Sequence, residues 1–282
     1  GTTPLKRTKD GNNFYGLGAS DMKGGIAAFL SAIEKTDTNV KIFLAIDEEN
    51  ISEGAWLAVR NNRDFFNDVE LIISAEPNFG LGINSITTGR TGRCIFTIEF
   101  IGKEAHIAEY QKGEDAINLA GNFISDFYKK RLKIFKSKKT IAQVRKVQAE
   151  SVGMSVCGDA FLEVEVLIDT PDSIFNIQSK LQSLTNAKVK ILKRKTPYLE
   201  GYKFASFPYR ENISEIIKEN TGRQMVLNTR SSVADDNVLA TLGTPVITWG
   251  PSGGNAHAEN EFIEIRSLET LSKMYKQLLE VV

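Results

Sequence analysis

The chain has 282 residues, 41% of them hydrophobic and 25% charged, a globular composition that fits one large or two ordinary domains. Its 35 basic residues balance its 35 acidic residues, so the net charge favours neither nucleic acid nor an anionic membrane as a partner. No apolar run approaches the roughly 20 residues of a membrane span, and we expect a cytoplasmic protein. The two cysteines, Cys94 and Cys157, are too few for a disulfide framework, and we expect both to be reduced and structural.

The chain begins with a polar stretch at residues 2–12, which carries a turn signal at Asp10-Gly11. Neither an initiator Met nor a predicted strand precedes this loop. We therefore expect the natural protein to have a further segment before Gly1.

A strand-to-helix junction at Asp21 organises the sequence that follows. Residues 13–18 are short and aromatic-led, as at the tip of a strand, and Asp21 lies where open α/β sheets place their ligands. A helix is predicted next, because apolar residues recur at i, i+3, i+4 and i+7: Ile26, Phe29, Leu30 and Ile33. A lone Asp before a helix is also a common helix cap, so Asp21 by itself does not identify a site.

Two further predicted strands also end in acidic residues. The apolar run 41–46 stops at Asp47-Glu48-Glu49, and the run 70–75 stops at Glu76. If these strands are parallel, their acidic tips meet at one edge of a sheet. A fourth apolar run, 245–250, leads into a Gly-rich loop that carries His257. The pattern brings one histidine and several carboxylates to strand ends from distant parts of the sequence.

The alternation of strands and helices over residues 13–86 predicts βα units and a mostly parallel sheet. The pattern changes near residue 89, where alternating apolar residues predict a strand at 93–101 with one exposed face. The elements predicted after it are a helix at 114–134, strands at 140–149 and 161–168, a helix at 172–184 and a strand at 188–192. This β-α-β-β-α-β order is that of the ferredoxin-like split βαβ arrangement.

The α/β pattern returns from residue 198. Helices are predicted at 211–219, from Asp235 onwards and at 267–279, and the last carries an apolar stripe of Leu268, Leu271, Met274, Tyr275 and Leu278. The predicted fold class is therefore α/β, with a mostly parallel catalytic domain at residues 1–88 and 196–282 and an inserted ferredoxin-like domain at 89–195.

Carboxylates and an imidazole at the edge of a sheet are ligands typical of zinc, whereas magnesium and calcium prefer oxygen alone. Two-metal hydrolytic sites hold their ions roughly 3.5–4 Å apart and need a bridging carboxylate, terminal ligands and a base that stays off the metals. Glu48 and Glu49 are adjacent at a strand end and can point in different directions, so they can divide the roles of base and ligand. Taken alone, the pair would be an ordinary solvated loop.

Five motifs of the sequence resemble those of the M20 metallopeptidase family, which includes deacetylases, desuccinylases, aminoacylases and carboxypeptidases. The motifs are Gly16-Leu-Gly-Ala-Ser-Asp21-Met-Lys-Gly-Gly25, Asp47-Glu48-Glu49 with Ser52-Glu53-Gly54-Ala55, Glu76-Pro77, the pair Gly89-Arg-Thr-Gly92 and Gly102-Lys-Glu-Ala-His106, and Ala256-His257 before Glu261. They occur in the family's order and span almost the whole chain.

The resemblance implies two zinc ions, for which cobalt or manganese could substitute. It implies that Asp21 bridges them, that Glu49 and His257 hold one, that Glu76 holds the other, and that Glu48 is the general base. It further implies that residues 89–195 form a lid and dimerisation domain, with a homodimer as the expected assembly. His106 would then stabilise the oxyanion of the substrate, although alone it would be an ordinary surface histidine.

The sequence also differs from the family pattern. The family has a further zinc ligand in a His-x-Asp motif upstream of Asp21, and this chain has only His106 and His257. One zinc position is thus left with Asp21 and Glu76 alone, and we expect this chain by itself to be inactive. The Asn and Arg with which the family binds substrate are also absent from residues 154–171. This chain has Val156-Cys157-Gly158-Asp159 and Ile168 at the corresponding positions.

The sequence, with the family it resembles, therefore predicts a zinc-dependent hydrolase that cleaves the amide bond of an N-acyl amino acid or short peptide with a free carboxylate. The Gly250–Gly254 loop either offers backbone N–H donors to the substrate carboxylate or is a turn that delivers His257. Two alternatives stay open: an exopeptidase or dipeptidase on the same scaffold, and a non-catalytic fragment or paralogue that binds a ligand without turnover.

Overall fold

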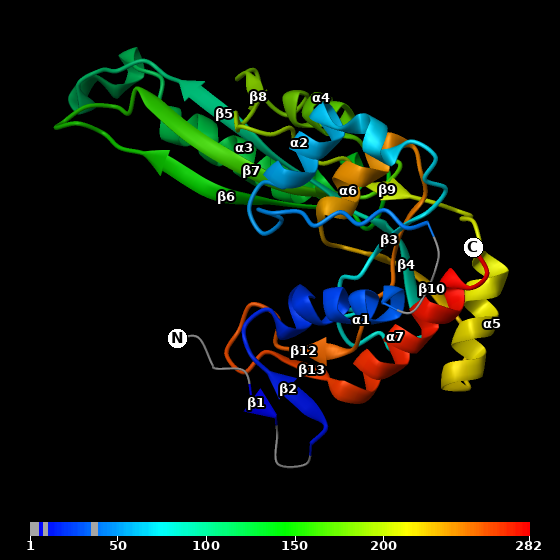
Figure 1. Ribbon diagram of the computed structural model, residues 1–282. Helices are drawn as coiled ribbons and strands as arrows, with labels where there is room; N and C mark the ends of the chain where they lie inside the picture. Colours follow the sequence, from blue (N-terminus) through cyan, green and yellow to red (C-terminus); the bar gives the residue numbers. More distant parts are fainter. Residues whose placement is uncertain (1–5, 8–10, 35–38) are drawn as a thin grey trace. The chain divides into compact units, whose positions relative to one another are not determined.

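The computed structural model describes residues 6, 7, 11–34 and 39–282 of the chain (Figure 1). The chain forms two compact units. The first unit comprises Gly1–Gly89, Lys203–Arg230 and Val238–Val282, and the second comprises Arg90–Tyr202 and Ser231–Asn237. Of the polar loop expected at residues 2–12, residues 2–5 and 8–10, including Asp10 of the turn signal, lie outside the described residues.

The first unit contains two sheets. One has the strand order β1-β2-β13-β12, and its described pairs are all antiparallel: β1 (Lys6–Arg7), β2 (Asn13–Tyr15), β12 (Gly253–Gly254) and β13 (Phe262–Glu264). The other has the order β10-β4-β11-β3, with β9 beside β4: β3 (Ile72–Ser74), β4 (Ser85–Arg90), β9 (Tyr202–Lys203), β10 (Val226–Arg230) and β11 (Val246–Thr248).

The prediction of a mostly parallel sheet is wrong. β11 pairs with β3 in parallel and with β4 antiparallel, and the ladders of the other two sheets are antiparallel. Parallel neighbours need a long crossover, usually a helix, between consecutive strands. In this chain β4 follows β3 after residues 75–84, which contain no helix, so the βα alternation does not continue.

The strand predicted at residues 41–46 is also absent from the described structure. This segment is irregular and pairs with no strand, and Leu44 and Ile46 are exposed. Side chains anchor it instead, since the Phe43 ring packs at 5.7 Å, edge to face, against Phe66 and Lys41 Nζ donates to the backbone oxygen of Asn67. An apolar run predicts a buried strand only if a neighbouring strand satisfies its backbone, and the run itself does not specify that neighbour.

The longer helices of the first unit are α1 (Gly24–Ile33), α2 (Glu53–Asn61), α5 (Arg210–Thr221) and α7 (Ile265–Leu279). The shorter helical turns are η1 (Ala19–Lys23), η2 (Arg63–Phe66), α6 (Asp235–Leu239) and η4 (Ala240–Leu242). Of these, α6 begins in the second unit. The predicted apolar stripe of α7 is confirmed, because Leu271, Met274 and Tyr275 are buried in the core around Trp249. The Tyr275 hydroxyl donates to the backbone oxygen of Trp249.

The helix predicted after Asp21 is confirmed as α1, but its buried face is shifted from the predicted one. Gly25, Ala28 and Ala32 are buried, whereas Leu30 is exposed. The start of α1 lies so close to the end of β3 that a Cβ at Gly25 would be 2.0 Å from the backbone oxygen of Ala75. Small residues permit this approach, and Phe29 and Ile33 of α1 are partly buried against the core around Trp249.

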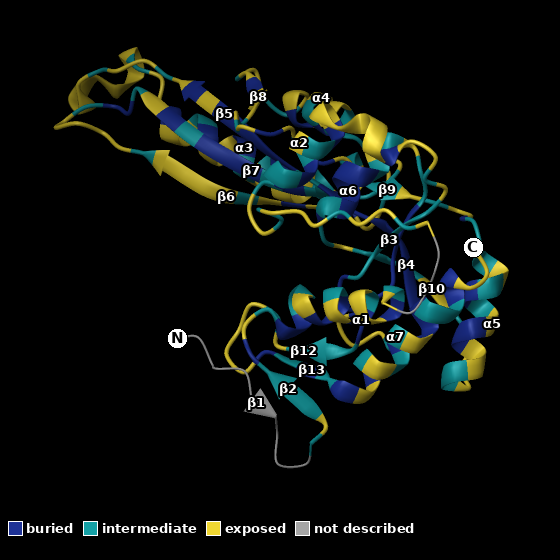
Figure 2. Ribbon diagram, viewed as in Figure 1, coloured by how far each residue is buried: buried dark blue, intermediate teal, exposed yellow. Residues whose placement is uncertain are grey.

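The second unit is one antiparallel sheet in the order β6-β7-β5-β8, built from β5 (Gly92–Ile101), β6 (Ile141–Ala149), β7 (Asp159–Ile168) and β8 (Val189–Ile191). Its helices are α3 (Ala116–Ile134) and α4 (Ile174–Gln182), preceded by the short turn η3 (Ile107–Lys112). The chain order β5-α3-β6-β7-α4-β8 is the predicted split βαβ arrangement. Figure 2 shows that β5 and β7 are largely buried and that β6 is largely exposed.

One face of this sheet carries the core of the second unit. Alternate residues of β5, including Phe96, Ile98 and Phe100, pack with Phe123 of α3 and Leu181 of α4. The exposed face predicted for residues 93–101 is confirmed only at its end, where Glu99 and Ile101 are exposed.

The segment Ser231–Asn237 is fixed within the second unit by polar contacts. Arg90 Nε lies 2.8 Å from Asp236 Oδ2, and both side chains are 2% exposed. Asn237 Nδ2 donates to the backbone oxygens of Thr91 and Glu200. Within the described part of the chain, no helix has both the length and the apolar character needed to cross a bilayer.

Candidate metal centre

Asp21 lies in a tight turn between β2 and α1. Gly18 has a φ of 75°, in the left-handed region that favours glycine, and this lets the chain reverse after β2. The Asp21 side chain is only 8% exposed. Asp21 therefore presents a largely buried carboxylate, as a ligand held by its own turn would.

Glu48 and Glu49 lie in a loop that Asp47 holds closed. The backbone oxygen of Asp47 accepts from Ser52 N at 2.9 Å, and its carboxylate accepts from Glu53 N at 3.3 Å. The loop thus ends where α2 begins. Although residues 41–46 form no strand, the acidic segment after them is still placed by local hydrogen bonds.

His257 lies in the connection between β12 and β13. Its φ is 62°, and Asn255 Nδ2 donates to the backbone oxygen of Asn260 at 3.3 Å, so the connection is a compact loop. β13 pairs with β2, with Phe262 opposite Tyr15. This pairing brings the His257 loop beside the Asp21 turn, because each follows or precedes one of the two paired strands.

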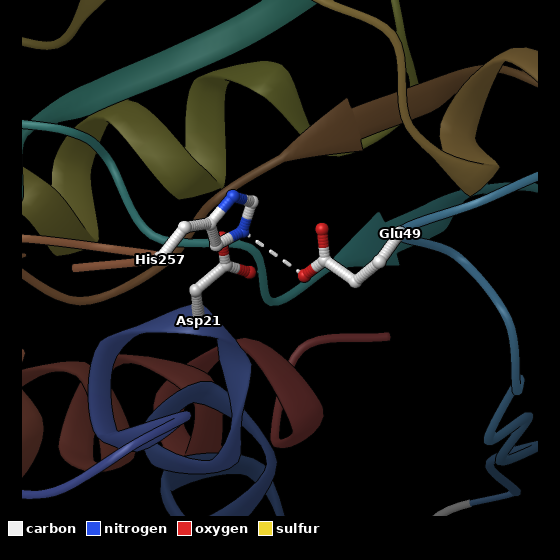
Figure 3. Close-up of side chains that lie close together, drawn as sticks. All are labelled: Asp21, Glu49 and His257. Atoms are coloured by element: carbon white, nitrogen blue, oxygen red, sulfur yellow. Dashed lines mark hydrogen bonds and ion pairs between the residues drawn. The ribbon is translucent and has the colours of Figure 1, made fainter. Parts of the chain in front are cut away.

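The structure brings together Asp21, Glu49 and His257 (Figure 3). His257 Nε2 lies 3.0 Å from Asp21 Oδ2 and 3.0 Å from Glu49 Oε1, and one ligand atom from each residue lies within 4.8 Å of the others. Among the described residues, these are the group of three or more His, Cys, Asp or Glu residues that could hold a metal ion. The side chains of His257 and Glu49 are 62% and 58% exposed, so the group is open to solvent on one side.

Two carboxylates and an imidazole suit zinc, whose bonds to such ligands are about 2.0–2.2 Å long. A tetrahedral ion with those bonds separates its ligand atoms by about 3.3 Å, close to the 3.0 Å observed from His257 Nε2 to each carboxylate. Burial by itself lowers the pKa of His257, but the negative charges of Glu49 and Asp21 outweigh it and raise the pKa above its ordinary value. The residues present therefore fit a divalent cation, which would relieve the concentration of negative charge.

Glu76 and Glu48 do not belong to this group of three. Glu76 follows β3 and is buried. The backbone at Glu76 is in close contact with Gly250, where a Cβ would lie 1.8 Å from the Glu76 oxygen. The loop 76–78 is also tied to the loop after β11, since Asn78 Nδ2 donates to Ser252 Oγ at 2.9 Å. The backbone at Glu76 is thus closely packed, and the role of Glu76 as a ligand stays a prediction.

Much of the Gly250–Gly254 backbone is hydrogen-bonded to other parts of the first unit. Ser252 N donates to Ser267 Oγ, and Gly253 and Gly254 pair with β13 as β12. His106 is exposed in the second unit, where its Nδ1 accepts from Ala108 N at 3.2 Å and caps η3. Its predicted role toward a substrate stays a prediction.

Sequence reasoning assigned no role to Glu261, which is 2% exposed. Its carboxylate accepts hydrogen bonds from the backbone of the Asp21 turn. The signal in the sequence was an acidic residue between the His257 loop and the apolar residues of β13, at a position expected to be buried.

Over residues 1–281 the sequence matches Peptidase family M20/M25/M40. The succinyl-diaminopimelate desuccinylase of Ehrlichia chaffeensis is 24% identical over 301 residues, covering 98% of this chain and 76% of that enzyme. The one from Blochmanniella floridana is 26% identical over 299 residues, covering 99% and 77%. The chain thus spans about three-quarters of the length of these relatives.

Solved structures share the fold. The aminopeptidase PepT of Bacillus cereus matches with a TM-score of 0.74 at 16% identity, covering 99% of this chain and 75% of that one. A tripeptidase of Staphylococcus aureus matches with a TM-score of 0.73 at 19% identity, covering 99% and 76%. The resemblance inferred from five motifs is confirmed: the chain belongs to peptidase family M20/M25/M40, a family of metal-dependent hydrolases.

Proposed function

We propose that this M20 family hydrolase cleaves the amide bond of N-acyl amino acids, with zinc bound at Asp21, Glu49 and His257. The observation that carries the proposal is the convergence of these three side chains from separate loops, with His257 Nε2 at 3.0 Å from a carboxylate oxygen of each of the other two. Three protein ligands with an open side is the usual arrangement of a catalytic zinc site.

Asp21 would be shared between two ions, with Glu76 as a protein ligand of the second. Glu76 follows β3, and β3 pairs in parallel with β11, whose following loop leads to β12 and His257. The close approach of the Glu76 backbone to Gly250 supports a ligand role, because metal ligands need a well-defined backbone position. Cobalt or manganese could replace zinc at such a site.

When bound, zinc lowers the pKa of water and polarises a carbonyl oxygen. Glu48 would accept the proton that the attacking water loses as its oxygen bonds to the acyl carbon, and would pass it to the departing amine nitrogen as the C–N bond breaks. The products are a carboxylate and an amine. Glu48 suits the base role because it lies beside Glu49 in the same loop and is not one of the three clustered residues.

The substrate class rests on the desuccinylases that this chain resembles at 24–26% identity over nearly its whole length. N-Succinyl and N-acetyl amino acids are therefore the first substrates to test. The matching peptidases support the fold alone, and di- and tripeptides serve as the competing substrates. His106 would stabilise the oxyanion if the second unit acts as a lid, or if a second copy of the chain donates it.

The test combines metal content with a substrate panel. The natural full-length protein is stripped of metal and titrated with zinc and with cobalt, and each form is assayed with N-succinyl amino acids, N-acetyl amino acids, dipeptides and tripeptides. We expect His257→Ala to lose metal binding and Glu48→Gln to retain it while losing turnover.

Preferential turnover of peptides would replace the acyl-amino-acid assignment with an exopeptidase. Metal binding without turnover of any substrate would favour the non-catalytic alternative. If the chain bound neither zinc nor cobalt, the proposed function would be wrong.

A further inference from the structure

The carboxylate of Glu261 is enclosed by the backbone of the turn that carries Asp21. Glu261 Oε2 accepts from Gly18 N at 2.7 Å, and Oε1 accepts from Ser20 N and from Asp21 N at 2.9 Å each. Glu261 is 2% exposed. A side chain 240 positions away therefore holds the backbone amide of a candidate ligand directly.

Burying an ionised carboxylate is costly unless hydrogen bonds or charges compensate it. Successive backbone N–H groups in a turn with a left-handed residue form a concave anion-binding site. The Asp21 turn has this geometry, with Gly18 at a φ of 75°, and its anion is a side chain of the same protein. Charge-assisted hydrogen bonds of this kind are roughly twice as strong as neutral ones, so the turn is held firmly.

Glu261 also connects the Asp21 turn to the His257 loop. Its backbone oxygen accepts from Gly16 N at 2.9 Å, and the next residue, Phe262, pairs with Tyr15 in the β13–β2 ladder. Glu261 lies at the end of the loop that carries His257. One residue thus contacts the Asp21 turn through both its main chain and its side chain, while its own loop supplies the imidazole.

We propose that Glu261 is a positioning residue that fixes Asp21 relative to His257 and so sets the geometry of the metal centre before metal binds. The proposal rests on the proposed function, because it assigns Glu261 a role in the same site. Glu261 is not one of the three clustered residues. It acts through the backbone of Asp21, whose Oδ2 lies 3.0 Å from His257 Nε2.

A purely structural role for Glu261 would predict a loss of stability and nothing more. The chain offers a matched control for this in Asp172 of the second unit. Asp172 is also buried, and its carboxylate accepts from Lys136 N at 3.0 Å, from Ser137 N at 2.9 Å and from Thr140 Oγ1. It holds a turn in the same way but in the unit that does not contain the metal cluster.

The test compares Glu261→Gln with Asp172→Asn, both of nearly unchanged size. Zinc affinity is measured by competition with a chelator, and the cobalt form is examined by its visible absorption. Groups that orient metal ligands typically change metal affinity 10–100-fold when removed, and we expect a loss of about 10-fold or more and an altered cobalt spectrum for Glu261→Gln. Asp172→Asn should lose stability with zinc affinity unchanged within about twofold.

Hydrogen exchange of the metal-free protein gives an independent readout. We expect Gly18, Ser20 and Asp21 amides to be protected in the wild type and to exchange faster in Glu261→Gln, since an amide group cannot accept at both oxygen positions. If Glu261→Gln does not fold, Glu261→Asp is measured instead, because it keeps the charge but withdraws the carboxylate by one methylene.

Equal zinc affinity and equal cobalt spectra for Glu261→Gln and Asp172→Asn would overturn the positioning role and leave the proposed function intact. Unchanged exchange of the three amides would also overturn it. If the wild type bound no metal, the proposed function would fail, and with it the role assigned to Glu261 in that site.

Discussion

Asp21 and His257 are 236 positions apart in the sequence, and Asp21 Oδ2 lies 3.0 Å from His257 Nε2. The β2–β13 ladder makes this contact possible, because Asp21 lies after β2 and His257 lies before β13. Glu49 joins them from a loop that belongs to neither strand. The candidate metal centre is therefore built from three loops that all belong to the first unit.

Glu48 and Glu49 should give opposite results when each is replaced by Gln. Glu48→Gln should retain metal and lower kcat by about 10²–10⁴-fold, the usual contribution of a general base. Glu49→Gln should weaken metal binding, because Glu49 Oε1 lies 3.0 Å from His257 Nε2 in the ligand cluster. Metal content and kcat are measured on the same preparations. Loss of metal from Glu48→Gln with retention by Glu49→Gln would reverse the two assignments.

The two histidines provide a matched pair for metal-linked stability. A ligand that binds only the folded state at 100 times its dissociation constant stabilises it by about 2.7 kcal/mol, so zinc should raise the Tm of the wild type. His257→Ala should abolish this rise, and His106→Ala, in the second unit, should preserve it. Thermal unfolding of the wild type and both variants, with zinc and with a chelator, measures the zinc-induced change in Tm. A zinc-induced rise that disappeared only in His106→Ala would move the metal site to the second unit.

Gly250 should not tolerate a methyl group. A Cβ there would lie 1.8 Å from the backbone oxygen of Glu76, so Gly250→Ala must displace one of the two loops. Overpacking of this kind typically costs about 1–3 kcal/mol. Gly121→Ala is the control, because a Cβ at this helical position meets nothing within 4 Å and Ala is favoured over Gly in a helix by about 1 kcal/mol.

Denaturant unfolding of both glycine variants measures the difference. Gly250→Ala should lower the free energy of unfolding and Gly121→Ala should not. Two equally stable variants would show that the Glu76 loop can move, which would weaken the case for Glu76 as a ligand.

Cys94 should be inert to thiol reagents in the folded protein. Burial, with a smaller contribution from the negative charge of Glu200, raises the pKa of the Cys94 thiol to about 12. Since the thiolate is the reactive form, modification at neutral or mildly alkaline pH should occur only after unfolding. Modification by an aromatic disulfide reagent, with and without denaturant, followed by peptide mapping measures this.

The same shift makes a prediction for alkaline stability. The unfolded thiol loses its proton near pH 9 and the folded thiol near pH 12, so between these values the folded state binds more protons. Stability is then fully present below pH 9 and falls as pH rises. Cys94→Ala should show a shallower fall over this range than the wild type. Equal slopes for the two proteins would indicate that Cys94 ionises freely in the folded state.

The sequence alone determined the elements whose periodicity reflects burial. The stripe along α7 predicted a buried face, on which Leu271, Met274 and Tyr275 lie. The apolar patterns of residues 93–191 predicted the β-α-β-β-α-β order that the chain has as β5-α3-β6-β7-α4-β8. Local pattern suffices in these cases, because the spacing of apolar residues along an element shows which of its faces is buried, wherever its neighbours lie in the chain. The motif residues also identified the family, since their types and order are independent of how the strands pair.

Only the tertiary structure decided which segments pair and which carboxylates meet. Residues 41–46 have the composition of a strand and form none, because an apolar run does not specify the partner that would satisfy its backbone. The side chains that converge are Asp21, Glu49 and His257, and this group does not include Glu48 or Glu76. The backbone conformation of the loops decides which carboxylates meet. Glu261 accepts a hydrogen bond from the backbone N–H of Asp21, 240 positions away in the chain. Every residue except proline has a backbone N–H, so the residue types do not reveal such a contact.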